Sequence, residues 1–379
     1  MDNPKYHLED NNPWQVHLSK WLPEEFSYLG FKVYGVNGIR SIYSERTQYK
    51  VEYRFLRLSF SPYILFGDEL LRVANMNNEK VCAIVVTFNR KKTLLECLFA
   101  LLSQTYPLTS IIVIDGPSTD GTEKALIEHG FIKDVPPSSN EIRVWHTENN
   151  IIQNDKLFSF YYIRIYDDVG GSGGFHEGFK KAYCEGYEWM WVMDDDVIPS
   201  PTALEKLILA LKNGYDAARP ALLDGEDFSP WFAGGIFSKR VIEKVGLPLK
   251  EFFIYWDDIE YITRCQRNGI KILDVPDAKV SHKDWLHKGM KYRILFGIVI
   301  ARPIFPKGRK YYYIQRNKIY FYLKYRMLKN LIYHLTLGLI IDLIAYLILK
   351  DSDKVLSILK GSLDAFLGKT GKSKWAHAR

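Results

Sequence analysis

The chain has 379 residues, of which 47% are hydrophobic and 25% charged, and its formal net charge is +7. This length allows two or three folded domains, and the composition excludes a disordered tail. Four scattered cysteines, none of them in a Cys-x-x-Cys pair, indicate neither a zinc site nor a disulfide framework.

The aromatic content of 15% suits a surface that faces carbohydrate or a membrane. Much of the positive excess lies after residue 286, as in the stretches Lys307 to Lys310 and Lys369 to Lys374. A basic C-terminal end favours membrane lipid or phosphate as a partner and argues against nucleic acid.

Residues 1–79 predict a small β-rich N-terminal domain. From Tyr49 to Phe55, apolar and charged residues alternate with the period of a half-buried strand. No apolar leader follows Met1, so we expect a cytoplasmic protein.

Residues 80–300 predict an α/β catalytic domain built on a parallel sheet. Apolar runs at 81–86, 111–114, 161–165 and 189–193 read as buried strands, and helical periodicity follows at 92–103, 122–129, 175–186 and 202–213. The polar stretch 134–158 reads as a loop or insertion.

Three carboxylates, Asp194, Asp195 and Asp196, follow the last of these apolar strands. Adjacent carboxylates repel one another and lose hydration, so a divalent cation is the simplest partner, and oxygen ligands suit Mg²⁺ or Mn²⁺. A solvated acidic turn before Pro199 is the alternative.

Other polar groups also stand where strands end, which is where open α/β sheets bind ligands. Thr87, Asn89 and Arg90 close the first strand, and Asp115 closes the second; these groups can contact a nucleotide, although Asp115 can equally cap a turn. The glycine-rich turn at 170–174 could bring backbone N–H groups to an anion, but it fits neither a P-loop nor a Rossmann fingerprint.

A second acidic cluster runs from Trp256 to Glu260. A carboxylate at a helix start can take a proton from a sugar hydroxyl, although helix capping explains Asp257 almost as well. Further on, His282 offers a nitrogen ligand and Trp285 a face for sugar stacking, while a lone His is more often structural.

Taken together and in order, these motifs resemble the family 2 glycosyltransferases of GT-A fold, and most closely the bacterial galactofuranosyltransferases. The resemblance spans roughly residues 80–290. Its more specific parts are the Gly-Gly-x-Gly-Gly stretch, the Trp-Asp-Asp-x-Glu run and the His-x-x-Trp pair.

The resemblance implies an inverting, metal-dependent transfer of galactofuranose from UDP-galactofuranose to a glycan or lipid-linked glycan of the cell surface. Asp194, Asp196 and His282 would hold Mn²⁺ or Mg²⁺, and Asp258 would be the base, with Asp257 and Glu260 positioning the acceptor. The remaining assignments are nucleotide-sugar contacts for Thr87, Asn89, Arg90, Asp115, Gly171, Gly173, Gly174 and Asp195, and acceptor or sugar contacts for Trp231, Trp256 and Trp285.

Residues 301–379 predict a basic, helical, membrane-associating region, and we expect attachment to the inner face of the cell membrane. The apolar segment 331–349 could span the membrane, lie at its interface or pack on the protein, because Asp342 in its middle disfavours a span. A second helix, 355–367, is amphipathic.

Three other functions stay open at this point. The run from Tyr312 to Asn317 also resembles rhamnosyltransferases, which keeps a dTDP-rhamnose or other hexosyl donor in view. A non-catalytic assembly protein would not need both metal carboxylates and a base, and a nucleotidyltransferase would leave the cluster at Trp256 and Trp285 without a role.

Overall fold

The computed structural model describes residues 79–137, 143–153, 156–223, 227–282, 290–295, 298–303 and 306–377. The chain divides into two compact units, Met1–Ala74 and Asn75–Arg379, and only the second contains described residues. The predicted β-rich N-terminal domain and Trp285 therefore lie outside the described residues.

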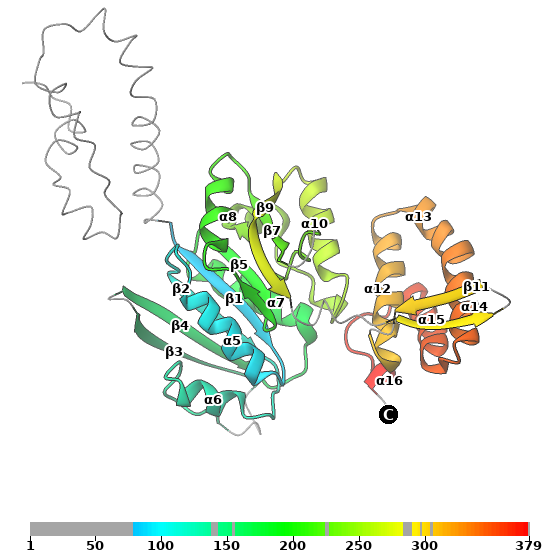
Figure 1. Cartoon of the computed structure of the whole chain (residues 1–379), viewed down its shortest axis with the longest axis horizontal. Coiled ribbons are helices and arrows are strands. Elements are labelled where there is room, and N and C mark those ends of the chain that lie inside the picture. The colour runs from blue at the N-terminus through cyan, green and yellow to red at the C-terminus, as the bar shows by residue number, and fades with distance from the viewer. Residues whose placement is uncertain are drawn as a thin grey trace, which may run out of the picture. The chain divides into compact units, whose positions relative to one another are not determined.

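The centre of the described unit is a sheet of parallel strands (Figure 1). β1 (Val81–Thr87) lies between β2 (Ser110–Asp115) and β5 (Trp189–Asp194), and β4 (Lys156–Ile165) extends the sheet beyond β2. Every residue of β1 and β2 is buried, which fits the apolar runs 81–86 and 111–114 at their centres. The predicted parallel α/β sheet is confirmed.

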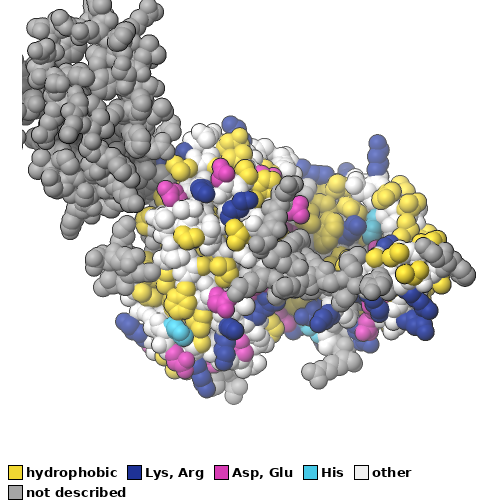
Figure 2. Space-filling view, viewed as in Figure 1, with side chains coloured by type: hydrophobic (Ala, Val, Ile, Leu, Met, Phe, Trp, Pro, Cys, Tyr) yellow, Lys and Arg dark blue, Asp and Glu magenta, His cyan; other side chains and the backbone are white. Residues whose placement is uncertain are grey.

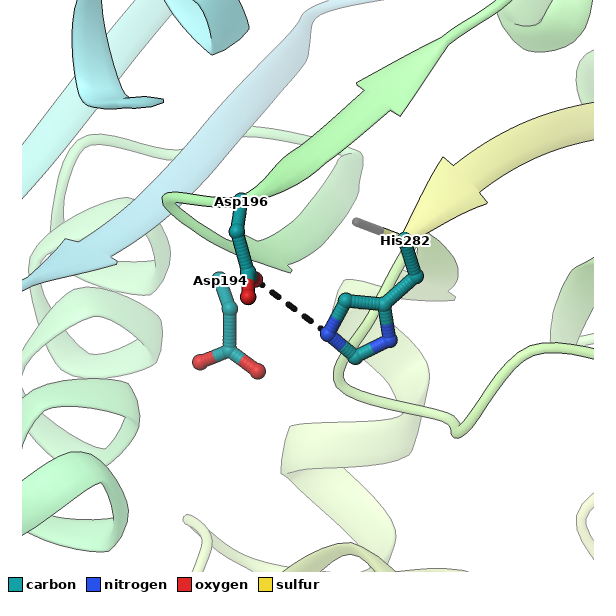
Figure 3. Close-up of side chains that lie close together, drawn as sticks. All are labelled: Asp194, Asp196 and His282. Carbon is teal, nitrogen blue, oxygen red and sulfur yellow. Dashed lines mark ion pairs between the residues drawn. The ribbon is translucent and has the colours of Figure 1, made fainter. Parts of the chain in front are cut away.

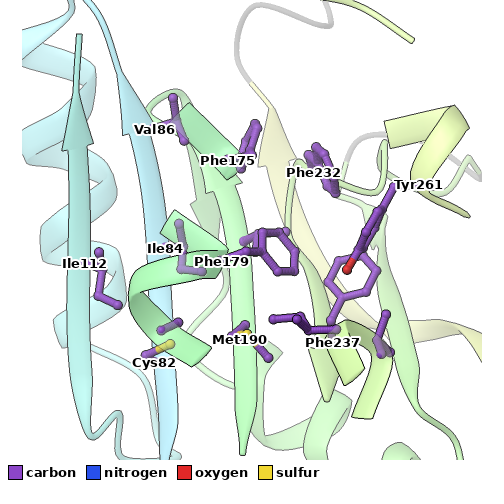
Figure 4. Close-up of a cluster of buried hydrophobic side chains, with 14 of the residues drawn as sticks. Cys82, Ile84, Val86, Ile112, Phe175, Phe179, Met190, Phe232, Phe237 and Tyr261 are labelled. Carbon is purple, nitrogen blue, oxygen red and sulfur yellow. The ribbon is translucent and has the colours of Figure 1, made fainter. Parts of the chain in front are cut away.

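Helices connect and cover these strands. They are α5 (Lys91–Leu102), α6 (Thr122–Glu128), α7 (Gly170–Cys184) and α8 (Ala203–Leu211). The core beside α7 is aromatic: Phe179 lies 5.6 Å from Phe237 and 5.5 Å from Tyr261, measured between ring centroids (Figure 4). This packing ties α10 (Asp257–Arg267), which carries Tyr261, to the central sheet.

The prediction of a loop over 134–158 is wrong for its second half. β3 (Val144–Gln153) pairs antiparallel with β4 at one edge of the sheet. Its polar side chains concealed the strand, and they are satisfied locally: Thr147 donates to Asp134 at 2.8 Å, and Asn149 donates to the Gly130 carbonyl at 3.0 Å.

We expected the glycine-rich stretch 170–174 to form a turn ahead of a helix. Instead it forms the first turns of α7 itself. An added Cβ at Gly174 would lie 2.5 Å from Val86 of β1, and one at Gly178 would collide with Ile84 of the same strand. These two glycines therefore let α7 approach the sheet closely.

The second half of the sheet is mixed. β7 (Ala217–Leu222) is parallel to β9 (Ile272–His282), whereas β8 (Gly235–Ser238) and β6 (Val197–Pro199) run antiparallel to their neighbours. α9 (Lys239–Val245) and the 3₁₀ turn Lys250–Phe252 lead from β8 toward α10. Within the described residues the full strand order is β3-β4-β2-β1-β5-β8-β7-β9-β6.

The C-terminal part begins with the hairpin β10 (Met290–Leu295) and β11 (Ile298–Pro303) and a 3₁₀ turn, Gly308–Lys310. The helices that follow are α12 (Tyr311–Lys324), α13 (Leu328–Tyr333), α14 (Leu339–Ile348), α15 (Ser352–Phe366) and α16 (Lys374–His377), with a π-helical turn, His334–Gly338, between α13 and α14. Helical structure was expected here, and these helices belong to the same compact unit as the sheet.

Candidate active site

Asp194, Asp196 and His282 form one cluster at the edge where β5 ends (Figure 3). β5 ends at Asp194, a tight turn carries Asp195 and Asp196, and β6 then pairs with β9 so that Val197 lies opposite His282. One potential ligand atom from each side chain lies within 4.8 Å of the other two. The expected metal ligands are therefore brought together from distant parts of the sequence.

Burial and mutual repulsion shift the pKa values of the three aspartates. Burial, then the charges of Asp196 and Asp195, raise the pKa of Asp194 well above its usual value. Burial likewise raises the pKa of Asp195 to about 7. Although burial opposes it, the hydrogen bond from His282 and the charge of Arg90 hold the pKa of Asp196 below its usual value. Two oxygen-bearing groups and an imidazole fit Mg²⁺ or Mn²⁺.

Thr87 and Arg90 hold the acidic run in place. The Thr87 hydroxyl donates to Asp195 Oδ2 at 2.7 Å, and Arg90 Nη1 lies 2.9 Å from Asp196 Oδ2 and 3.6 Å from Asp195 Oδ1. Asp195 is buried, as is Asp196, and its carboxylate faces Thr87; its role as a nucleotide-sugar contact stays a prediction. In this arrangement Asp195 fixes the turn between two ligands of the proposed metal.

Asn89 and Asp115 organise the loop after β2. Asn89 adopts φ 55°, and its Oδ1 accepts a hydrogen bond from the Thr119 N–H at 2.7 Å. Asp115 is fully buried and accepts from Ser118 at 2.5 Å, Tyr162 at 2.6 Å and Arg164 at 3.1 Å. Sequence reasoning missed Tyr162 and Arg164, whose only signal is their place on the strand beside Asp115.

The second acidic cluster lies at the start of α10. Asp257 is the first residue of that helix and is buried, as is Glu260, while Asp258 is half-buried and accepts the Ile259 N–H at 2.8 Å. Burial, then the charge of Asp258, raises the pKa of Asp257 to about 7. The charge of Asp257 also contributes to the raised pKa of Asp194.

Glu260 has a structural environment. Its Oε2 lies 3.0 Å from Arg264 Nη2, and its Oε1 accepts from the Tyr325 hydroxyl at 2.5 Å. Both oxygens thus have partners within the protein, and the side chain joins α10 to the end of α12. The role in positioning an acceptor stays a prediction.

The candidate sugar-binding tryptophans are packed in the protein. Trp231 is 7% exposed and lies 5.9 Å from Phe237 in the core, with Arg219 stacked 5.1 Å from its ring. Trp256 is half-buried, with its ring 5.5 Å from Phe321 of α12. The burial of Trp231 leaves little of its ring for a ligand, so that expectation is not supported.

The three candidate glycines, Gly171, Gly173 and Gly174, differ in how much space surrounds them. A Cβ at Gly173 would lie 2.6 Å from Val169, and one at Gly174 would meet Val86, whereas nothing lies within 4 Å of the position at Gly171. Close packing accounts for Gly173 and Gly174. Gly171, in the first turn of α7, is the one of the three candidate glycines with open space beside it.

This arrangement combines a candidate cation site with a half-buried carboxylate at a helix start, a combination that suits group transfer from a diphosphate. Residues 82–153 and 149–244 match the family model described as Glycosyl transferase family 2. Residues 82–244 thus form a glycosyltransferase family 2 domain. The chain is a glycosyltransferase, and the sequence-based expectation of the family and of its α/β GT-A core is confirmed.

Curated proteins similar to this chain include the galactofuranosyltransferase GlfT1 of Mycolicibacterium smegmatis, 22% identical over 231 residues, which are 51% of this chain and 68% of that protein. GlfT1 of Mycobacterium tuberculosis CDC 1551 is 23% identical over 238 residues, covering 54% and 70% respectively. Among solved structures, the mannosyltransferase PcManGT of Pyrobaculum calidifontis, in complex with GDP-Man and Mn²⁺, aligns with a TM-score of 0.44 at 16% identity over 82% of this chain and 86% of its own.

Proposed function

We propose that this glycosyltransferase moves galactofuranose from UDP-galactofuranose to a glycan acceptor in cell-surface polysaccharide synthesis, with inversion at the anomeric carbon. The observation that carries the proposal is the cluster of Asp194, Asp196 and His282, whose potential ligand atoms lie within 4.8 Å of one another at the end of β5 in the family 2 domain. The names of the curated relatives support the choice of donor.

Asp194, Asp196 and His282 would hold the Mn²⁺ or Mg²⁺. When bound, the metal supplies a Lewis acid that stabilises the charge on the departing diphosphate. Arg90 adds a guanidinium at the same place, because it already lies 2.9 Å from Asp196. The buried Thr87–Asp195 hydrogen bond keeps the turn between the two ligands fixed.

Asp258 is the proposed base. Among the three acidic residues at the start of α10, it alone is half-buried while Asp257 and Glu260 are buried, so it is the most accessible to an acceptor hydroxyl. Burial raises the pKa of Asp258, which makes its carboxylate a stronger proton acceptor near neutral pH. Asp258 takes the hydroxyl proton as the acceptor oxygen bonds to the anomeric carbon and the carbon–oxygen bond to UDP breaks.

The test is a donor panel with the purified chain. UDP-galactofuranose, UDP-galactopyranose and dTDP-rhamnose are compared by release of the nucleotide, with and without Mn²⁺. We expect turnover with UDP-galactofuranose only; turnover with dTDP-rhamnose alone would establish the rhamnosyl alternative, and no turnover with any donor would favour a non-catalytic assembly protein.

Asp258→Asn tests the base. We expect transfer to fall by at least about 100-fold while UDP binding with Mn²⁺ stays near the wild-type value, because the amide keeps the shape but cannot take a proton. The matched control is Asp277→Asn, which changes an exposed aspartate on β9. Wild-type activity in Asp258→Asn would remove the base assignment.

An anionic membrane surface is the proposed partner of the C-terminal helices. Residues 301–379 contain sixteen Lys and Arg against four Asp, a net charge of +12, whereas the whole chain carries +7, so residues 1–300 carry −5. Figure 2 shows hydrophobic side chains together with Lys and Arg over the C-terminal helices. Apolar contact combined with positive charge suits lipid of the inner face of the cell membrane.

The helical run Leu328–Ile348 supports attachment at the interface. Among the described helices it alone is long and apolar enough to cross a membrane. Its most apolar 18 residues have a mean hydropathy of 2.0, and only 22% of them are buried. Asp342 in its middle pairs with Arg302 at 3.0 Å, which holds the helix to β11 and would place two charges inside a bilayer if it spanned one. The exposed apolar side chains are Leu328, Ile332, Tyr333, Leu337, Ile340, Ile341, Ile344 and Leu347.

Vesicle sedimentation tests this attachment without any need for turnover. Wild-type protein should bind vesicles of phosphatidylglycerol and phosphatidylcholine more tightly than phosphatidylcholine alone, and Ile340→Glu with Leu347→Glu should weaken binding by about 10-fold or more. The control, Val135→Glu, changes an exposed valine of the catalytic part. Self-association in solution with no vesicle binding would assign the apolar face to a second copy of the chain instead.

A further inference from the structure

The loop that leads into α10 has an unfavourable backbone conformation. Phe253, Tyr255 and Trp256 have φ values of 64°, 65° and 71°, in the left-handed region that residues with a Cβ rarely adopt. The next residue is Asp257, the first of α10. A conformation of this kind persists only where the surroundings hold it, and such loops are common at functional sites.

Asn317 of α12 contacts the carbonyl groups of this loop. Its Nδ2 lies 2.9 Å from the oxygens of Phe252 and Ile254 and 2.8 Å from that of Tyr255. The amide has two hydrogens, so the three acceptors share them. Asn317 is 1% exposed, so water cannot take over these bonds if its amide is lost.

Arg316 fixes the orientation of the Asn317 amide. Its Nε donates to Asn317 Oδ1 at 2.9 Å, and because a guanidinium only donates, the amide must turn its NH₂ group to the loop. Arg316 also donates to the Phe252 carbonyl at 3.0 Å and to the Gly371 carbonyl at 2.5 Å. The buried guanidinium is thus matched by peptide and amide oxygens, with the rings of Tyr312 and Tyr313 beside it.

The other side of the loop rests on α7. The Ser172 N–H donates to the Phe253 carbonyl at 3.0 Å, and Gly170 stands where any Cβ would collide with that carbonyl. The loop is therefore held between α7 and α12, and it leads directly into Asp257 and Asp258 of α10.

We propose that Arg316 and Asn317 are positioning residues for the transfer reaction: they hold the loop Phe252–Trp256 so that Asp257 and Asp258 begin α10 at the right place for transfer. Neither side chain contacts substrate in this role. The proposal rests on the proposed function for its catalytic consequence, while the geometry of the loop can be tested without it.

Asn317→Asp is the sharpest test, because it keeps the shape of the side chain and replaces the NH₂ group by an oxygen that repels three carbonyls. We expect kcat to fall by about 10- to 100-fold, since small displacements of a catalytic group have effects of this size, while the affinity for UDP with Mn²⁺ changes by less than about twofold. Hydrogen–deuterium exchange over residues 252–260 should become faster.

Gln315→Glu is the matched control. It makes the same amide-to-carboxylate change two residues earlier in α12, where Gln315 is equally buried but contacts His334 and Ser362 away from the loop. We expect kcat within about twofold of wild type and unchanged exchange over 252–260. If Asn317→Asp does not fold, Asn317→Ser, which keeps one small donor, is compared with the same control and should lose less activity.

Equal kcat and equal exchange in Asn317→Asp and Gln315→Glu would overturn the proposal. A loss of UDP affinity in parallel with kcat would also overturn it, because that result means general damage to the site. If wild-type protein turns over no donor, the proposed function fails, and faster exchange confined to 252–260 still establishes the clamp on the loop.

Discussion

Replacing Glu260 by Gln separates a structural from a substrate-binding role for this buried acid. Glu260 is 0% exposed, its Oε2 pairs with Arg264 at 3.0 Å and its Oε1 accepts from Tyr325 at 2.5 Å. The amide of Gln can accept one of these hydrogen bonds but must turn its own NH₂ group toward the other donor. One buried donor therefore loses its partner.

The loss of stability expected for Glu260→Gln depends on the other contacts of Arg264. The removal of one partner from a buried ion pair has effects of about 3 to 5 kcal/mol, and hydrogen bonds to charged groups contribute about 1.5 to 3 kcal/mol. Arg264 also donates to the carbonyls of Val245 at 2.5 Å and Leu247 at 3.0 Å, which keep it partly satisfied. We therefore expect a loss near the lower end, about 2 kcal/mol, or a drop of about 4 to 8 °C in Tm.

Differential scanning calorimetry and acceptor kinetics together decide the question. Glu260→Gln should lower Tm with little change in KM for the acceptor, and the control Glu243→Gln, at an exposed position of α9, should stay within about 0.5 kcal/mol of wild type. An unchanged Tm with a raised acceptor KM would refute this reasoning and restore Glu260 as an acceptor-positioning residue.

Three further outcomes are expected. Burial raises the pKa of Asp257 to about 7, so between about pH 4 and pH 7 the folded protein keeps a proton that the unfolded chain has lost. The free energy of unfolding of the metal-free protein should therefore fall by about 2 to 4 kcal/mol over this range. Urea denaturation of Asp257→Asn should show a weaker dependence of this free energy on pH, and the same dependence as in wild type would contradict the reasoning. Asp196→Ala and His282→Ala should each weaken Mn²⁺-dependent UDP binding by about 10- to 100-fold in calorimetry, and an unchanged affinity would take them out of the metal site. Gly174→Ala should destabilise the protein by about 1 to 2 kcal/mol because its Cβ meets Val86, whereas Gly171→Ala should stabilise it by about 0.5 to 1 kcal/mol; thermal unfolding of the pair checks the packing role.

The strands that were predicted correctly are those that are buried on both faces. β1 and β2 have continuous apolar sequences because helices cover both sides of the sheet. β3 was missed because its buried polar groups, such as Asn149, are satisfied by carbonyls that lie close only in the folded chain. Hydropathy along the sequence cannot show such partners.

The candidate metal site was predictable in composition but not in geometry. The three aspartates after an apolar strand indicated a cation, whereas the position of His282 depends on the pairing of β6 with β9, which no local pattern encodes. The glycines misled for a related reason: a stretch that reads as an anion-binding turn is needed for close packing of α7 on β1. The resemblance to a family, and not the pattern itself, identified Asp258 as the candidate base.

The contacts of Gly371 bear on how this enzyme can be handled and altered. Its N–H donates to the Glu251 carbonyl at 2.7 Å, just before the loop that leads into α10, and its own carbonyl accepts from Arg316. A protein shortened before this residue would retain the whole family 2 domain and still lose a support of its reaction centre. Attempts to improve solubility should therefore change the exposed apolar side chains of α14 and α15 and keep the segment around Gly371 intact.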